Sequence, residues 1–194
     1  MVGSFEGFAD IWGIPYLMAA YSYSKAEAAA LISFIFVGML FGGPILTIFS
    51  QKFGNYVVIS CCGIGMATIF LMLLTFNEHN MVMLAILFFC TGIMCCYQVL
   101  IFSAGCDLVD GSILTVTVAF LNCINMLGGS FFHTLIGNLM DLFWGEQIED
   151  GLRQYSVNSY NNALMVIPIC SLIGATMILL IAKKATKEKL QNVT

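Results

Sequence analysis

Two carboxylates and a histidine stand inside stretches of sequence that are otherwise almost wholly apolar. Glu6 and Asp10 are four residues apart, which places them on one face of a helix. Two carboxylates this close could hold a proton, because like charges disfavour ionisation of both groups. The free imidazole side chain titrates near neutrality, so a histidine at position 133 would suit a proton relay. A solvent-exposed or interfacial helix end would also explain the presence of the acidic pair in an apolar stretch. A structural hydrogen bond would likewise explain the presence of His133.

A stripe of polar and small residues surrounds His133. Its members follow one another at steps of three or four residues and therefore share one helix face. Such a stripe either lines a water-filled path or packs against a neighbouring helix, and the sequence leaves both alternatives open. Tyr97, Gln98 and Ser103, in another apolar stretch, could contact a polar solute or bond to neighbouring helices. The residues of the stripe are Asn122, Asn125, Gly129, His133, Gly137 and Asp141.

The apolar stretches that carry these residues are long enough to cross a lipid bilayer. A hydrocarbon core about 30 Å thick needs roughly 20 apolar residues in a helix. The chain has 194 residues, of which 60% are hydrophobic and 9% charged, and its mean hydropathy is +0.94. We therefore expect an all-α polytopic membrane protein: one six-helix bundle over residues 1–182 and a basic tail at 183–194, with no nucleic-acid partner. The expected spans are 1–22, 27–49, 56–76, 81–105, 112–142 and 160–182.

The lysines and the single arginine predict how the bundle is oriented. Basic residues are retained on the cytoplasmic side of a membrane. With an even number of spans, both termini share one side, and five of the seven basic residues fall there, against Lys25 and Arg153 on the other side. We therefore expect both termini in the cytoplasm, and the loop at 145–159 outside as a simple solvated connection. The five residues on the cytoplasmic side are Lys52, Lys183, Lys184, Lys187 and Lys189.

Sulfur-containing and small residues within the spans have mainly structural explanations. All eight cysteines lie in or beside apolar spans, so a disulfide framework is not expected. The pairs Cys61-Cys62 and Cys95-Cys96 could be soft-metal ligands of a copper carrier, but adjacent helical residues point about 100° apart, which favours small apolar packing. We therefore expect no metal and no cofactor. Gly38-x-x-x-Gly42, followed by Gly43-Pro44, predicts a close helix contact and a kink.

The connection between the second and third spans, GPILTIFSQKFGN from Gly43 to Asn55, resembles the loop signature of the major facilitator superfamily. Lys52 and Gly54 match the basic residue and the glycine of that signature. Gln51 and Asn55 stand where an acidic and a basic residue are expected. The resemblance therefore implies a cytoplasmic loop in this position. Because Gln51 and Asn55 are uncharged, the resemblance does not extend to the charge contacts by which this loop closes the cytoplasmic side in the family.

Two further segments are similar to the carboxy-terminal half of bacterial members of this superfamily. They are residues 8–17 (FADIWGIPYL), and 120–122 (FLN) running on to 135–141 (LIGNLMD). The similarity weakens at 110–119, where Thr115-Val116-Thr117 replaces an expected run with proline, glycine and alanine. The resemblance implies spans seven to twelve of a twelve-span transporter, with cytoplasmic termini. It also implies that the helices holding Glu6, Gln98 and Asn122 face a central cavity.

These observations favour a secondary transporter and not an enzyme. We expect half of a rocking-bundle transporter of a small polar or organic solute. Its membrane would be a bacterial inner membrane, and its partner a second six-helix half. Proton coupling through Glu6, Asp10 or His133 is optional in this hypothesis. A truncated gene remnant, or a six-span assembly module without transport activity, is the alternative. An intramembrane hydrolase using His133 and Asp141 is disfavoured, because eight residues of helix separate them by about 12 Å.

Overall fold

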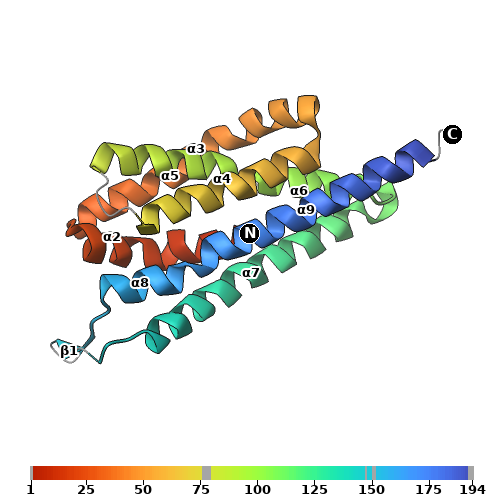
Figure 1. Cartoon of the computed structure of the whole chain (residues 1–194). Helices are drawn as coiled ribbons and strands as arrows, with labels where there is room; N and C mark the ends of the chain where they lie inside the picture. The colour runs from red at the N-terminus through yellow and green to blue at the C-terminus, as the bar shows by residue number, and fades with distance from the viewer. Residues whose placement is uncertain (1, 76–79, 147, 150–151, 192–194) are drawn as a thin grey trace.

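The structure, a computed structural model, describes residues 2–75, 80–146, 148–149 and 152–191. Long helices lie side by side along one axis, and a short hairpin stands at one end (Figure 1). In chain order the elements are α1 (Val2–Gly7), the π-helical turn η1 (Phe8–Trp12), α2 (Gly13–Tyr21), α3 (Lys25–Phe53), α4 (Asn55–Thr75), α5 (Met81–Cys95), α6 (Tyr97–Cys106), the 3-10 turn η2 (Gly111–Ile113), α7 (Leu114–Leu142), β1 (Ile148–Glu149), β2 (Leu152–Arg153), α8 (Val157–Leu164) and α9 (Val166–Gln191).

Within the described residues, five helical stretches are long and apolar enough to cross a membrane: Lys25–Phe53, Asn55–Thr75, Met81–Cys106, Gly111–Leu142 and Val157–Lys183. They match the second to sixth predicted spans to within a few residues, and the predicted all-α membrane bundle is confirmed. The first predicted span is helical from Val2 to Tyr21, but the turn η1 divides it and it falls outside this set. Residues 183–191, predicted as a tail, continue α9 as helix.

Local signals fix where several helices begin and end. The hydroxyl of Ser24 accepts from the main-chain N–H of Glu27, and the Glu27 carboxylate accepts from the main-chain N–H of Ser24, so a capping box starts α3. Asn80 caps α5 in the same way with a single bond to Met83. Gly54 ends α3 at a φ of +86°, a conformation that glycine adopts without strain.

Helices α3 and α5 cross at a patch of glycines. A Cβ added at Gly38 would collide with the Phe89 carbonyl, and one at Gly42 would lie 2.7 Å from the Ile93 carbonyl. Gly92 in α5 faces the same crossing from the other side, against Ile35 and Gly38. Close approach of this kind is how helices associate in lipid, where no hydrophobic force drives them together. The contact predicted for Gly38 and Gly42 is therefore confirmed, and α3 continues as helix through Pro44.

The first helical stretch packs on α7 through a second set of glycines. Gly3 lies against the main chain of Gly128, and Gly7 faces the ring of His133. Further along the pair, a Cβ at Gly137 would lie 3.3 Å from the Trp12 ring. The glycines of the predicted polar stripe therefore serve helix packing, which leaves its polar members available for a cavity.

The described part of the connection from α7 to α8 forms side-chain contacts among exposed residues, here called the clasp. The sequence did not predict this pairing. Asp141 accepts a hydrogen bond from Arg153 at 2.8 Å and from the Tyr155 hydroxyl at 2.6 Å. Trp144 donates its indole N–H to the Gln154 carbonyl, and the Arg153 guanidinium lies 4.6 Å from the centre of the Trp144 ring. The bond to Asp141 raises the pKa of the Tyr155 hydroxyl. These contacts tie the hairpin to the end of α7.

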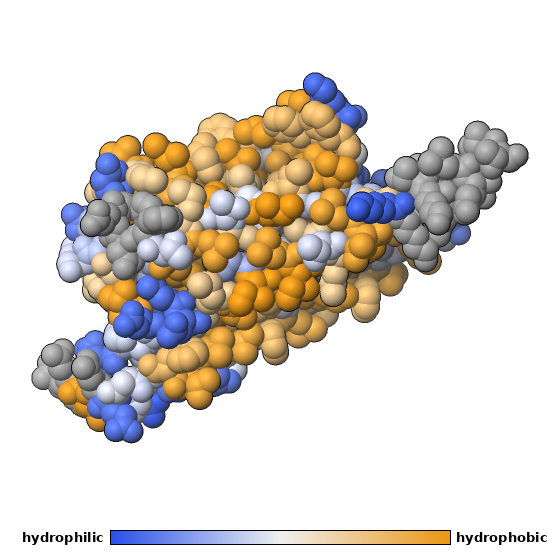
Figure 2. Space-filling view, viewed as in Figure 1, coloured by the Kyte–Doolittle hydropathy of each residue, from blue (hydrophilic) through white to orange (hydrophobic). Residues whose placement is uncertain are grey.

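The outer surface matches a protein that is surrounded by lipid. Hydrophobic residues cover the middle of the visible face, and hydrophilic residues gather toward the two ends (Figure 2). Large apolar side chains are exposed on several spans, among them Leu40 on α3, Ile86 on α5 and Phe120 on α7. In water such a surface would aggregate, whereas in a bilayer it contacts acyl chains.

Candidate solute cavity

Two helix irregularities lie next to each other in the middle of the bundle. The first is the π-helical turn η1, which comes just before Pro15. Pro15 has no N–H to donate to the carbonyl four residues earlier, Ile11, and its ring crowds that carbonyl, so the turn before it departs from α geometry. The second is the break at Cys96 between α5 and α6, where the Cys96 thiol donates to the Met39 carbonyl of α3 at 3.1 Å. Broken helices of this kind commonly shape binding sites within membranes.

A cavity of about 410 Å³, here called the central cavity, lies between these irregularities. Its polar lining consists of Glu6 and Asp10 from the first helical stretch, Gln98 from α6, and Ser130 and His133 from α7. Phe5, Ala9, Ile35, Phe36, Met39, Cys95, Met126 and Gly129 complete the walls. A largely apolar pocket with a few convergent polar groups is the usual form of a small-molecule site.

The acidic residues and the histidine face one another across this cavity. The Nε2 atom of His133 lies 3.8 Å from an Asp10 carboxylate oxygen, which is ion-pair distance if the ring is protonated and too long for a hydrogen bond. The side chain of His133 is 29% exposed and that of Asp10 is 52% exposed. Among the described residues, His133 Nε2 is a buried nitrogen without a hydrogen-bond partner. No described residue therefore holds this nitrogen by a hydrogen bond, and it faces the Asp10 carboxylate.

Glu6 stands beside this pair. Its half-buried carboxylate interacts electrostatically with Asp10 and His133. It also lies near Asn125, whose amide nitrogen is buried and makes no hydrogen bond to the described residues. A Cβ at Gly129 would lie 3.0 Å from a Glu6 carboxylate oxygen, so glycine at 129 leaves room for this carboxylate. Glu6, Asp10, Asn125 and His133 therefore form one group of polar side chains, of which the two carboxylates and the imidazole are ionisable.

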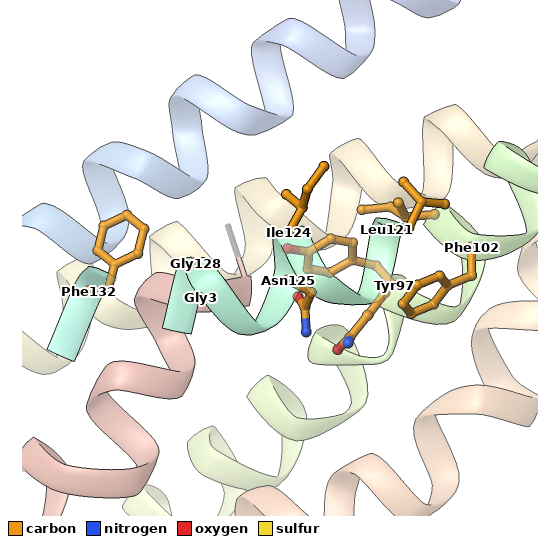
Figure 3. Close-up of a pocket in the computed structure, with 10 residues that line it drawn as sticks. Gly3, Tyr97, Phe102, Leu121, Ile124, Asn125, Gly128 and Phe132 are labelled. Carbon is orange, nitrogen blue, oxygen red and sulfur yellow. The ribbon is translucent and has the colours of Figure 1, made fainter. Parts of the chain in front are cut away.

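A second cavity of about 260 Å³ adjoins the first and shares Gln98 with it. Figure 3 shows Tyr97 and Phe102 of α6 near Ile124 and Asn125 of α7, with Gly3 and Gly128 beside them. Tyr97 is almost fully buried and forms part of this wall. The two cavities together extend the polar surface from His133 to Asn125.

The structure brings together most of the residues that the sequence singled out. Glu6, Asp10, Gln98 and His133 line the central cavity, and Tyr97 and Asn125 line the adjoining one. Asn122 is exposed and is not among the lining residues of either cavity. Ser130, Met39 and Cys95 were not predicted. The position of Pro15 is a sequence signal for the nearby irregularity, whereas no proline or glycine marks the break at Cys96.

Three residues of the loop signature, Gln51, Lys52 and Gly54, lie at the α3–α4 turn, whereas Gly43 lies within α3. Gly54 adopts the positive φ of that turn, and Lys52 lies over the Phe53 ring at 5.2 Å. Gln51 is exposed. A Cβ at Gly43 would meet nothing within 4 Å. The turn geometry accounts for Gly54, and the roles of the other three stay predictions.

Three of the four paired cysteines pack inside the bundle. Cys62, Cys95 and Cys96 are buried free thiols, and Cys61 is exposed on the outside of α4. The Cys95 sulfur lies 3.6 Å from the Met66 sulfur. Within the described residues, no group of three or more His, Cys, Asp or Glu side chains could hold a metal ion.

Comparison with known proteins decides the family. Residues 7–193 match the sequence model of the Major Facilitator Superfamily. The chain belongs to this superfamily. Its members are membrane transporters. Searches of curated proteins and of solved structures return no match.

Proposed function

We propose that this facilitator is a proton-coupled secondary transporter bundle in which the central cavity binds a small polar solute. The observation that supports this proposal is the convergence of Glu6, Asp10, Gln98 and His133, from three helical segments, on one cavity. Intramembrane ionisable residues are expensive to bury and usually mark a substrate or proton pathway.

Proton coupling would use the Asp10–His133 pair. With His133 protonated, the 3.8 Å separation from Asp10 makes an attractive ion pair; with His133 neutral, two carboxylates face the cavity. A proton that enters with the solute would favour the state in which His133 is protonated and paired with Asp10. Because the ionisable lining is two carboxylates and one histidine, the cavity favours a cationic or neutral polar solute over an anion.

Alternating access would require a second six-helix bundle opposite the cavity. In rocking-bundle transporters the site lies between two such bundles. The exposed apolar side chains of α3 and α7, which flank the central cavity, offer a surface for that contact. We also propose that both termini are cytoplasmic and that the membrane is a bacterial inner membrane. The proposed orientation rests on the distribution of lysines, and the proposed membrane rests on the sequence resemblance.

Transport assays in proteoliposomes test this function. The chain would be reconstituted alone and together with a candidate partner bundle, and uptake of labelled amino acids, amines, sugars and organic acids measured with and without an inward proton gradient. We expect uptake of a cationic or neutral solute that rises with the gradient and falls in Asp10→Asn. An uptake rate that is the same with and without the proton gradient would contradict proton coupling. The absence of uptake in both preparations would favour an assembly module.

A further inference from the structure

A third cavity, here called the hairpin cavity, lies at the end of the bundle that carries β1 and β2. Its volume is about 550 Å³, and the first residues of α3, the end of the hairpin and the start of α8 border it. Its charged lining consists of two cations, Lys25 and Arg153. Gln154, Tyr155 and Tyr160 add polar groups, and Ile14, Pro15, Met18 and Ala19 of α2 form an apolar wall.

The electrostatics of this cavity favour an anion. Lys25 is the first residue of a 29-residue helix, so the positive end of the helix dipole adds to its charge. Lys25 forms no ion pair with any described residue. Arg153 has five N–H donors, and its bond to Asp141 uses Nη1. Positive charge from three sources therefore surrounds one hollow, and it is offset in part by Asp141 and by Glu27, whose carboxylate caps the same helix start.

The position of the cavity along the membrane normal indicates which kind of anion it binds. Lys25 begins one candidate span, and Arg153 lies in the connection between two others, so both stand at the level of the lipid headgroups. The apolar wall of α2 runs toward the hydrocarbon, where it can contact an acyl chain. Basic pockets between membrane helices bind anionic headgroups in this way. The carboxylates of the central cavity would repel an anion, so the occupant is distinct from a transported solute.

We infer that the hairpin cavity is a binding site for the phosphate headgroup of an anionic phospholipid. Lys25 and Arg153 contact the phosphate, the Tyr160 hydroxyl donates to a glycerol or ester oxygen, and α2 supports the first acyl chain. The Tyr155 hydroxyl already donates to Asp141 and can only accept from the glycerol. Because Arg153 also lies over the Trp144 ring and binds Asp141, an occupied site holds the clasp between α7 and α8 in place. This site does not depend on the proposed transport function.

Native mass spectrometry of the intact chain tests the inference. The protein would be released from nanodiscs containing phosphatidylglycerol and phosphatidylcholine in equal amounts, and the retained lipids counted. We expect one phosphatidylglycerol to be retained in preference, and Lys25→Gln to weaken that retention about tenfold, the loss of one charge-assisted contact. Lys25→Arg keeps the charge and should retain the lipid. Lys183→Gln, at the far end of the bundle, should also retain it.

Other outcomes would overturn the inference. Equal retention of both lipids, or an unchanged Lys25→Gln, would show that the cavity does not select a headgroup. Equal losses in Lys25→Gln and Lys183→Gln would show a general effect of surface charge. Circular dichroism and gel filtration of each variant distinguish unfolding from lost binding. Displacement of the lipid by millimolar inorganic phosphate would show instead that the site serves a free anion.

Discussion

Replacement of Gly92 by alanine tests the glycine crossing of α3 and α5. A Cβ at this position would overlap the Ile35 carbonyl and would lie 3.0 Å from the Cα of Gly38. Ordinary contacts between carbon atoms are about 3.5–4.0 Å, so the two helices must separate by about 1 Å. Overpacking of this size costs about 1–3 kcal/mol, and the better helix propensity of alanine returns up to about 1 kcal/mol. We expect a net loss of about 1–2 kcal/mol.

The buried thiols of the protein provide the assay. In a variant that keeps only Cys62 and Cys96 of the eight cysteines, these two thiols are buried in the folded bundle and react with a fluorogenic maleimide once it opens. For a chain of this length, the expected loss lowers the thermal midpoint by roughly 2–8 °C. Gly43→Ala is the matched control, because it is also a mid-helix glycine but has nothing within 4 Å of its Cβ position. A midpoint for Gly92→Ala at or above that of Gly43→Ala would refute the reasoning.

Three further predictions concern the cavity and the clasp. Asp10→Asn removes the partner of His133, so we expect uptake to become independent of the proton gradient; a retained pH response in vesicle assays would contradict this role. Gln98→Ala removes a neutral hydrogen-bonding group shared by both cavities, so the apparent KM should rise about fivefold with proton dependence unchanged, and an unchanged KM would exclude contact with the solute. Asp141→Asn weakens the bonds from Arg153 and Tyr155, so hydrogen exchange around the hairpin should quicken. In the unmodified protein the raised pKa of Tyr155 keeps its hydroxyl bond intact below about pH 10, and the bond is lost as pH rises through that pKa; protection that does not change across this range would contradict the assignment.

Hydropathy and helix periodicity predicted the spans because the bilayer itself selects for them. Length and apolarity are properties of a single segment, so five spans could be placed without knowledge of their neighbours. The i, i+4 spacing of Glu6 and Asp10 likewise predicted a shared face. The sequence did not predict the 3.8 Å distance between His133 and Asp10. This distance depends on how the first helical stretch crosses α7, and glycine contacts between these two distant segments set the crossing.

Features that depend on several segments at once were missed. The clasp joins Asp141 to Arg153 and Tyr155 across a hairpin, and nothing in the local sequence of 145–159 indicates which of its polar groups will pair. The break at Cys96 is stabilised by a thiol bond to α3, again a contact between distant segments. Asn122 was predicted from the same periodicity as Asn125, but the stripe from Asn122 to Asp141 extends further along α7 than either cavity does.

Cysteine accessibility measures most directly whether the central cavity is a water-filled solute site. Ser130→Cys lines the cavity, and Thr68→Cys is an exposed control on α4. Both would be expressed from the native locus, so that whatever covers the bundle in the cell is present. The background keeps only Cys62 and Cys96 of the native thiols, because Cys95 itself lines the cavity. A charged methanethiosulfonate reacts with thiolates in water and does not enter hydrocarbon. We predict that it modifies Ser130→Cys and spares Thr68→Cys. Equal resistance of both positions would contradict an aqueous cavity lined by Glu6, Asp10 and His133.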